Sequence, residues 1–320
     1  AFIFDVHELM HDNPYHNFDH CMDVTQTLFY LIRLTEPRTH LTVVEKFAMM
    51  VAAIAHDMDH PGVSNAFLVT TRDPLATTYN DSSVLENRHI ACLYTLVESV
   101  PEADIFGAIE DDATWRDIRR IIIACVLHTD MVHHFKTVSQ VDVFYELHGG
   151  VIESDSEGHK CVYESKEDRS FMMSLLLHCA DISNPVKPFN VYESWAQRVL
   201  TEFFNQGDKE KANSLPVSAQ MDRDTTSKPM SQIGFMEFIV APLYGGLQKL
   251  FPETAPLVQN LLDNRRRWND AYEKDVDRSK KSREEKEREK GAMKNRFNAF
   301  VQKYSKVEKM NAGRRGSTQN

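Results

Sequence analysis

Residues 45–60 read EKFAMMVAAIAHDMDH, and Pro61 and Gly62 follow directly. The run from Met49 to Ala55 is entirely apolar, as expected of a helix that is buried on all sides. A proline–glycine pair is a typical helix end. We therefore predict a buried helix over residues 45–60 whose last turn carries His56, Asp57 and His60.

The rest of the chain also favours helices. Asn13 followed by Pro14 is typical of an N-cap with proline at the first helical position, and it predicts a long helix as far as Glu36. Apolar periodicity predicts further helices over residues 83–99, 114–135, 168–181, 191–205, 231–250 and 254–272. Only residues 151–162 carry a modest hairpin pattern. The fold class predicted is all-α, a compact, bundle-like domain of many helices.

Composition places the chain among ordinary globular proteins. The 320 residues are 42% hydrophobic and 26% charged, which favours one large domain. Charges crowd together from Glu273 to Lys290. We therefore expect a globular domain over residues 1–272, followed by a charged C-terminal helix or tail over residues 273–320.

The charge balance limits the partners. The chain has 37 basic and 47 acidic side chains, which argues against binding to a nucleic-acid polymer and against docking on an anionic membrane. An anionic substrate would need local cations, and bound metal ions can supply them. No apolar stretch approaches the roughly 20 residues of a transmembrane segment.

The cysteines indicate a cytoplasmic location. Five are scattered along the chain with no CxxC pair, as expected for reduced thiols. Because the chain starts at Ala1 without a methionine or a signal-peptide pattern, we interpret it as an excerpt of a longer protein. An upstream regulatory domain, membrane targeting by missing segments and a homodimer are all left open.

Histidines and carboxylates occur at spacings that suit a metal site. His16 and His20, like His56 and His60, are four residues apart, and such a pair lies on one face of a helix. Asp57 adjoins His56, and a carboxylate can bridge two cations while the neighbouring imidazole binds one of them. This combination suits a mixed site of Zn²⁺ with Mg²⁺ or Mn²⁺.

Asp181 follows an apolar helix in the sequence HCADISNP. A carboxylate that emerges from a buried segment needs a partner, and a metal ion is a good one. The alternative is an ordinary carboxylate that caps the next turn.

Five motifs follow one another along the chain: YHNFDHCMDV at 15–24, HDMDHPG at 56–62, LENRH at 85–89, HCADISNP at 178–185 and SQIGF at 231–235. In this order and spacing they resemble the catalytic domain of class I cyclic nucleotide phosphodiesterases, a helical fold of the HD type. The resemblance covers about residues 13–268, so it implies that the domain over residues 1–272 is catalytic.

The resemblance implies a role for each motif. His20, His56, Asp57 and Asp181 would coordinate Zn²⁺, and Asp57 would also reach a second ion, usually Mg²⁺ or else Mn²⁺. The second shell would consist of His60, Glu86, His89, Thr129 and Asp130. Two such cations activate a water for in-line attack on phosphorus, and His16 is the general acid that protonates the leaving 3′ oxygen.

The same resemblance implies a purine pocket. Gln232 would contact the purine edge and Phe235 its face, with Val199 as the opposite jaw by spacing. Further candidates for the pocket wall are Asn184, Tyr15, Tyr192 and Phe203. The expected reaction is hydrolysis of cAMP, with cGMP as a further substrate, to the nucleoside 5′-monophosphate. The sequence leaves the preference between the two open.

Two other functions remain as alternatives. A metal-dependent phosphohydrolase of the wider HD type would act on acyclic nucleotides, although the motif at 231–235 argues against it. A helical binding domain without activity would keep the pocket and lose the chemistry. Separately, Arg314-Arg315-Gly316-Ser317 resembles the sites of basophilic kinases and makes Ser317 a candidate for phosphorylation.

Overall fold

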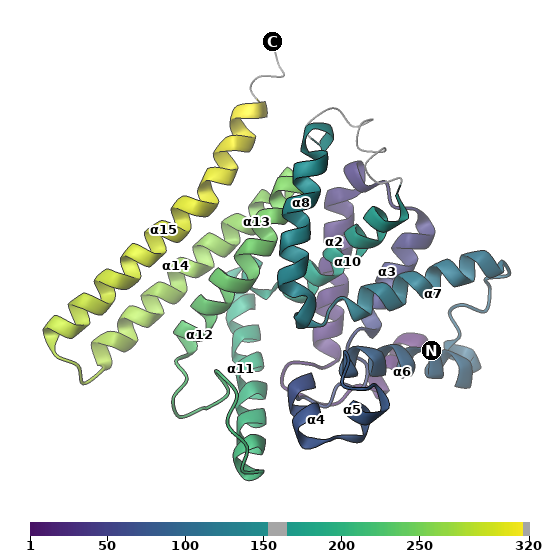
Figure 1. Cartoon of the computed structure of the whole chain (residues 1–320), viewed down its shortest axis with the longest axis horizontal. Coiled ribbons are helices and arrows are strands. Elements are labelled where there is room, and N and C mark those ends of the chain that lie inside the picture. Colours follow the sequence, from purple (N-terminus) through teal and green to yellow (C-terminus); the bar gives the residue numbers. More distant parts are fainter. Residues whose placement is uncertain (153–164, 316–320) are drawn as a thin grey trace. The chain divides into compact units, whose positions relative to one another are not determined.

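The computed structural model describes residues 1–152 and 165–315, and these residues form helices and no strand (Figure 1). The α-helices are α1 Phe2–Glu8, α2 Phe18–Thr39, α3 Val43–Ala55, α4 Asn65–Thr71, α5 Pro74–Thr78, α6 Val84–Ser99, α7 Asp112–Leu127, α8 His134–Ile152, α10 Lys166–Asp181, α11 Phe189–Ala212, α12 Lys228–Phe235, α13 Ala241–Leu250, α14 Ala255–Arg278 and α15 Arg283–Arg315. Short 3₁₀ turns are η1 Pro101–Ala103, η2 Met131–His133, η3 Asn184–Val186 and η5 Pro252–Thr254, and η4 Met236–Val240 is a π-helix. The predicted all-α class is confirmed.

The chain divides into two compact units. Unit 1 comprises residues 1–137, 150–182 and 198–222, and unit 2 comprises residues 138–149, 183–197 and 223–320. In unit 1, α3 packs against α2 and α7, and α10 packs against the same two helices. In unit 2, α14 contacts α12, α13 and α15, and α15 runs back along α14 (Figure 1).

The helix predicted to start at Asn13 begins at Phe18 instead. Asn17 caps it, since its Oδ1 accepts the backbone N–H of His20 at 3.1 Å. The Asn13 side-chain amide donates hydrogen bonds to two backbone carbonyls, that of His16 at 2.8 Å and that of His60 at 2.7 Å. His16 therefore lies in the loop before α2, so the prediction that it shares a helix face with His20 is wrong.

The helix predicted over residues 45–60 ends at Ala55. It starts with a capping box, in which the Thr42 side chain accepts the N–H of Glu45 and the Glu45 carboxylate accepts the N–H of Thr42. Its end differs from the prediction because Asp59 and Gly62 adopt left-handed φ values of 61° and 68°. The loop over residues 56–62, rather than a helical turn, carries the HDMDH residues.

The other helix predictions are mostly confirmed, and several helices are longer than predicted. The helix over residues 114–135 is the exception, because α7 stops at Leu127 and Asp130 caps the new turn η2 through the N–H of Val132. Residues 151–152 end α8, and the rest of the predicted hairpin lies outside the described residues, as does Ser317. Across residues 1–152 and 165–315, every helix is too short or too polar to cross a bilayer.

Candidate functional site

Four side chains of unit 1 converge on one buried point. His20 comes from α2, His56 and Asp57 follow α3, and Asp181 is the last residue of α10. His20 Nε2 lies 3.2 Å from Asp181 Oδ1 and 3.4 Å from Asp57 Oδ2. His56 Nε2 lies 3.2 Å from Asp57 Oδ2 and 3.4 Å from Asp181 Oδ1. The packing of α2, α3 and α10 thus brings together all four residues that the sequence predicted as ligands.

The orientation of His56 suits it to bind a metal ion. Its Nδ1 donates a hydrogen bond to the carbonyl of Ala53 at 2.8 Å, which points Nε2 into the cluster, where it could bind a cation once it has released its proton. Both this Nε2 and Asp57 Oδ2 are buried, and within the described ranges 1–152 and 165–315 neither atom has a hydrogen-bond partner. Buried polar atoms without a partner are costly, and a cation between them would satisfy both.

The spacing and charge of the cluster fit a divalent cation. A tetrahedral ion with bonds of about 2.0–2.1 Å separates its ligand atoms by about 3.3 Å. Burial alone would raise the pKa of Asp57, but the nearby positive charge of His56 outweighs burial and holds it well below its usual value. Burial alone would lower the pKa of His56, but the charge of Asp57 outweighs it and raises the pKa instead. The Asp57 carboxylate is therefore stabilised by positive charge at this point.

A second group of polar side chains surrounds the cluster. His89 on α6 donates from Nδ1 to the carbonyl of Met58 at 2.6 Å and points its Nε2 at Asp57 Oδ1, 3.7 Å away. Glu86, one turn earlier, accepts the amide of Asn65 at 3.0 Å. The pKa of Glu86 is raised to about 7, mainly by burial and secondly by the negative charge of Asp130. Such crowded carboxylates favour a nearby cation.

Thr129 and Asp130 lie in the turn after α7. The Thr129 hydroxyl donates to the carbonyl of Val126 at 2.8 Å, and Asp130 accepts the Ser83 hydroxyl at 2.9 Å. Both residues therefore have hydrogen-bond partners within the protein, and Asp130 links this turn to the start of α6.

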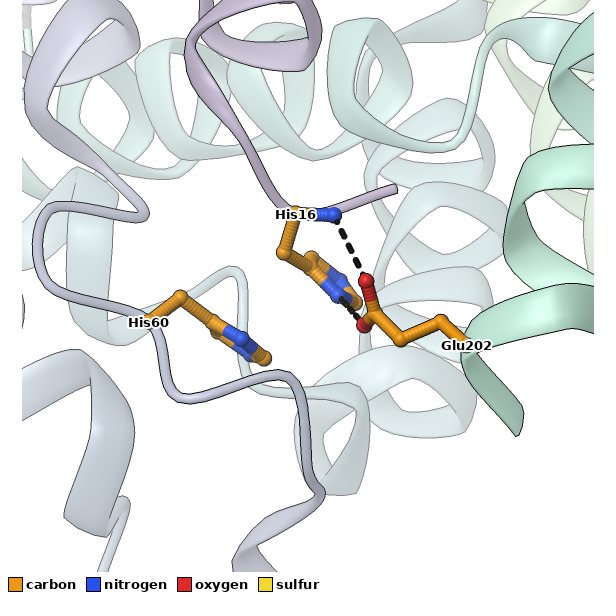
Figure 2. A group of neighbouring side chains, drawn as sticks. All are labelled: His16, His60 and Glu202. Atoms are coloured by element: carbon orange, nitrogen blue, oxygen red, sulfur yellow. Dashed lines mark hydrogen bonds and ion pairs between the residues drawn. The ribbon is translucent and has the colours of Figure 1, made fainter. Parts of the chain in front are cut away.

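His16 lies between an acid and a second histidine (Figure 2). Glu202 on α11 accepts the backbone N–H groups of Tyr15 and His16, each at 3.0 Å, and pairs with His16 Nδ1. On the other side, the ring of His60 stacks on that of His16, with centroids 4.0 Å apart and 20° between the planes. The sequence reasoning missed Glu202, because an acid within a predicted helix gives no sign of burial, and here only 4% of this residue is exposed.

The environment of His16 keeps it protonated at neutral pH. Burial alone would lower its pKa, but the hydrogen bond to Glu202 and the charges of Asp57, Glu202 and Asp181 raise the pKa to about 8. Since Glu202 occupies Nδ1, the proton on Nε2 is the one available for transfer. Glu202 thus holds a protonated His16 ring in one position.

The predicted pocket residues fall in both units. In unit 2, the Tyr192 hydroxyl donates to Gln232 Oε1 at 2.9 Å, and Asn184 is buried in η3. Phe235 ends α12 and is half-buried. The unit 1 candidates are Tyr15, whose ring centroid lies 4.5 Å from that of His20, and the half-buried Val199 and Phe203 on α11.

Removal of metal should destabilise the protein. Treatment with a chelator is expected to lower the melting temperature by several degrees, since a ligand present at 100 times its Kd stabilises the folded state by about 2.7 kcal/mol. Differential scanning calorimetry before and after chelation, and after re-addition of Zn²⁺ and Mg²⁺, measures the shift. An unchanged melting temperature in protein shown by elemental analysis to have lost its metal would argue against the cluster as a cation site.

Comparison with known proteins gives one family. Residues 15–261 match the sequence model of the 3′5′-cyclic nucleotide phosphodiesterase family. The chain is 35% identical over 269 residues to the high affinity cGMP-specific 3′,5′-cyclic phosphodiesterase 9A of Homo sapiens, covering 84% of this chain and 43% of that protein. It is 37% identical over 259 residues to the 3′,5′-cyclic-AMP phosphodiesterase 4C of Mus musculus, covering 79% of this chain and 36% of that protein. The chain thus spans less than half of either relative.

The fold is also similar to that of a solved phosphodiesterase domain. The crystal structure of the phosphodiesterase domain of Salpingoeca rosetta rhodopsin phosphodiesterase aligns with a TM-score of 0.78 and 31% identity, over 85% of this chain and 80% of that one.

Proposed function

Since the chain belongs to the 3′5′-cyclic nucleotide phosphodiesterase family, we propose that it hydrolyses 3′,5′-cyclic nucleotides to nucleoside 5′-monophosphates. One observation carries the proposal: the four-residue cluster that fits a cation lies beside His16, a histidine that Glu202 keeps protonated. Phosphodiester opening needs both parts, because the phosphate requires positive charge and the leaving alkoxide requires a proton.

We propose that His20, His56, Asp57 and Asp181 hold Zn²⁺, and that Asp57 also faces a second ion, Mg²⁺ or Mn²⁺. When bound, such cations neutralise phosphate oxygens and acidify water. The proposed second shell is His60, Glu86, His89, Thr129 and Asp130. Its clearest support is the hydrogen bond from His89 to Met58, which orients the imidazole toward Asp57.

His16 would transfer its Nε2 proton to the leaving 3′ oxygen of the ribose. Glu202 positions the ring through Nδ1 and stabilises the imidazolium before transfer, and the stacked His60 restricts its rotation. Asn13 fixes the same loop by donating to the His16 and His60 carbonyls. These contacts hold the donor in one orientation, which is what general acid catalysis requires.

The pH profile tests this pairing. Without bound cations the folded pKa of His16 is about 8, above its ordinary 6.5, so kcat/KM should be retained while the ring is protonated and fall as the pH rises through the His16 pKa. Bound cations repel the imidazolium and move this limb lower. The comparison of Glu202→Gln with the unchanged enzyme leaves the other groups around His16 in place. These groups are the carboxylates of Asp57 and Asp181 and the rings of His20 and His60.

Glu202→Gln should therefore move the alkaline limb to lower pH, because the carboxylate that stabilises the protonated ring is lost. Steady-state rates from pH 6 to 9, at fixed metal concentration, measure the shift against the unchanged enzyme. An alkaline limb that stays in place in Glu202→Gln would mean that another group sets it.

We propose that the purine contacts Gln232 and Phe235, with Asn184, Tyr15, Tyr192, Val199 and Phe203 as further pocket residues. The Tyr192 hydroxyl restrains the Gln232 amide, which supports a fixed hydrogen-bonding edge for a base. Relatives named for cGMP and for cAMP match this chain at 35% and 37% identity, so we propose both as substrates. We further propose that residues 1–272 form the catalytic domain. We also propose a cytoplasmic location for the protein.

A panel of nucleotides separates this proposal from the HD-type alternative. With Zn²⁺ and Mg²⁺ present, the purified chain should release 5′-AMP from cAMP and 5′-GMP from cGMP, and should leave deoxynucleoside mono- and triphosphates intact. Chromatography of the products measures both. Turnover of the acyclic nucleotides alone would instead favour the alternative.

A further inference from the structure

A buried ion network in unit 2 joins three helical segments. Arg265 on α14 is fully buried, and its Nε donates to Glu237 Oε1 at 2.8 Å. The other carboxylate oxygen of Glu237 accepts from Arg296 Nε on α15 at 2.6 Å. The two oxygens of one carboxylate are thus held by arginines from two different helices, α14 and α15.

This network fixes Glu237 firmly. Only 9% of its side chain is exposed. A charged carboxylate that is shielded from water is stable only when ion pairs or hydrogen bonds replace the lost hydration. Breaking a buried ion pair by removing one partner costs far more than an exposed pair contributes, because a charge is left uncompensated. Arg296 is 34% exposed, so it can be truncated with less damage than Arg265.

The face of α15 that carries this contact is packed against the protein from Met293 to Tyr304. Met293, Phe300 and Tyr304 are buried, and the spacing of seven and four residues places them on one side of the helix. Arg265 Nη2 lies 3.3 Å from Met293 Sδ. A Cβ at Gly245 on α13 would lie 2.9 Å from the Tyr304 ring, so the absence of a side chain there lets α15 approach.

Glu237 is also part of the helix that carries the proposed purine contacts. It belongs to the π-helix η4, which continues directly from α12. The N–H of Met236, the residue before Glu237, donates to the carbonyls of Gln232 and Ile233. A π-turn inside a helix is less regular than the α-helix around it and is frequent at functional sites. A shift of Glu237 would therefore be passed to the turn of Gln232 through the adjacent residue, Met236.

We propose that α15 positions the α12 turn that carries Gln232 and Phe235, and that it acts through the contact of Arg296 with Glu237. The inference rests on the proposed function, because it assigns these two residues to the purine. The family match ends at residue 261, whereas α15 spans Arg283–Arg315. Substrate affinity in this chain thus depends on a helix outside the matched region.

Arg296→Ala in the full chain tests the proposal. KM for cAMP and cGMP should rise about 2- to 30-fold, the range of coupling through packed networks, while kcat and metal content stay close to those of the unchanged protein. Arg296→Lys should restore part of the loss, because it keeps the charge. Arg288→Ala, at an exposed arginine of the same helix, is the matched control and should change nothing.

Hydrogen exchange gives a readout that does not need activity. In Arg296→Ala, peptides over residues 228–250 should exchange faster, while α2 should be unaffected. Faster exchange confined to α15 with an unchanged KM would overturn the proposal, and so would an equal effect of Arg288→Ala. If the unchanged protein turned over no cyclic nucleotide, the proposed function would fail, and exchange over residues 228–250 would still decide the coupling. Arg296→Gln serves if the alanine variant does not fold.

Discussion

Replacing Asp181 with alanine is expected to lower kcat/KM for cAMP or cGMP by more than about 100-fold, the upper range for loss of even an outer-shell metal partner. Asp181 Oδ1 lies within 3.4 Å of both His20 Nε2 and His56 Nε2, so its removal takes away a donor that both imidazoles face. It also removes one of the carboxylates that attract positive charge to the cluster. The cation should then bind weakly.

Metal content measured beside the kinetics identifies the cause. Asp181→Ala should lose bound metal by elemental analysis, and Asp181→Asn, which keeps the shape, should lose activity nearly as severely. Asp117→Ala, at an exposed aspartate of α7, is the matched control and should retain both. Full metal content together with full activity in Asp181→Ala would exclude this residue from the ligand set.

His16→Ala should lower kcat by about 10²- to 10⁴-fold, the usual contribution of a positioned general acid. The ring lies beside the cluster without supplying one of its four converging atoms, so metal content should be unchanged. A phosphodiester with a p-nitrophenolate leaving group should be far less affected, because that group departs without a proton. His7→Ala, at an exposed histidine of α1, should behave like the unchanged protein. Loss of metal in His16→Ala, or an equal loss on both substrates, would contradict the assignment of a proton donor.

Much of the site could be predicted because its residues occur in dense local motifs. Spacing and residue chemistry indicated a metal site near His20, His56, Asp57 and Asp181, the resemblance to the phosphodiesterase family singled out these four as ligands, and the structure brings them together. The local geometry was predicted less well. The HDMDH residues lie on a loop because Asp59 takes a left-handed φ, and spacing alone does not reveal such a backbone conformation at a residue other than glycine.

Contacts between distant segments could not be predicted. Glu202 is 186 residues from His16, and nothing in the sequence TEFFNQ distinguishes it from a surface acid. Its neighbours in register, Gln206 and Glu210, are also buried, so this face of α11 is a polar stripe inside the protein. The pairing of Glu237 with Arg296 has the same character. The charged residues 273–320 gave no sign of which face of α15 would dock.

The position of bond cleavage shows whether this chain opens the cyclic phosphodiester at its 3′ oxygen. The purified chain with Zn²⁺ and Mg²⁺ is incubated with cAMP or cGMP in ¹⁸O-labelled water, and the product is analysed by mass spectrometry and phosphorus NMR. We expect a nucleoside 5′-monophosphate with one ¹⁸O in its phosphate and none at the 3′ hydroxyl, because water attacks phosphorus and His16 protonates the departing 3′ oxygen. A nucleoside 3′-monophosphate, label at the 3′ hydroxyl, or intact substrate would contradict it.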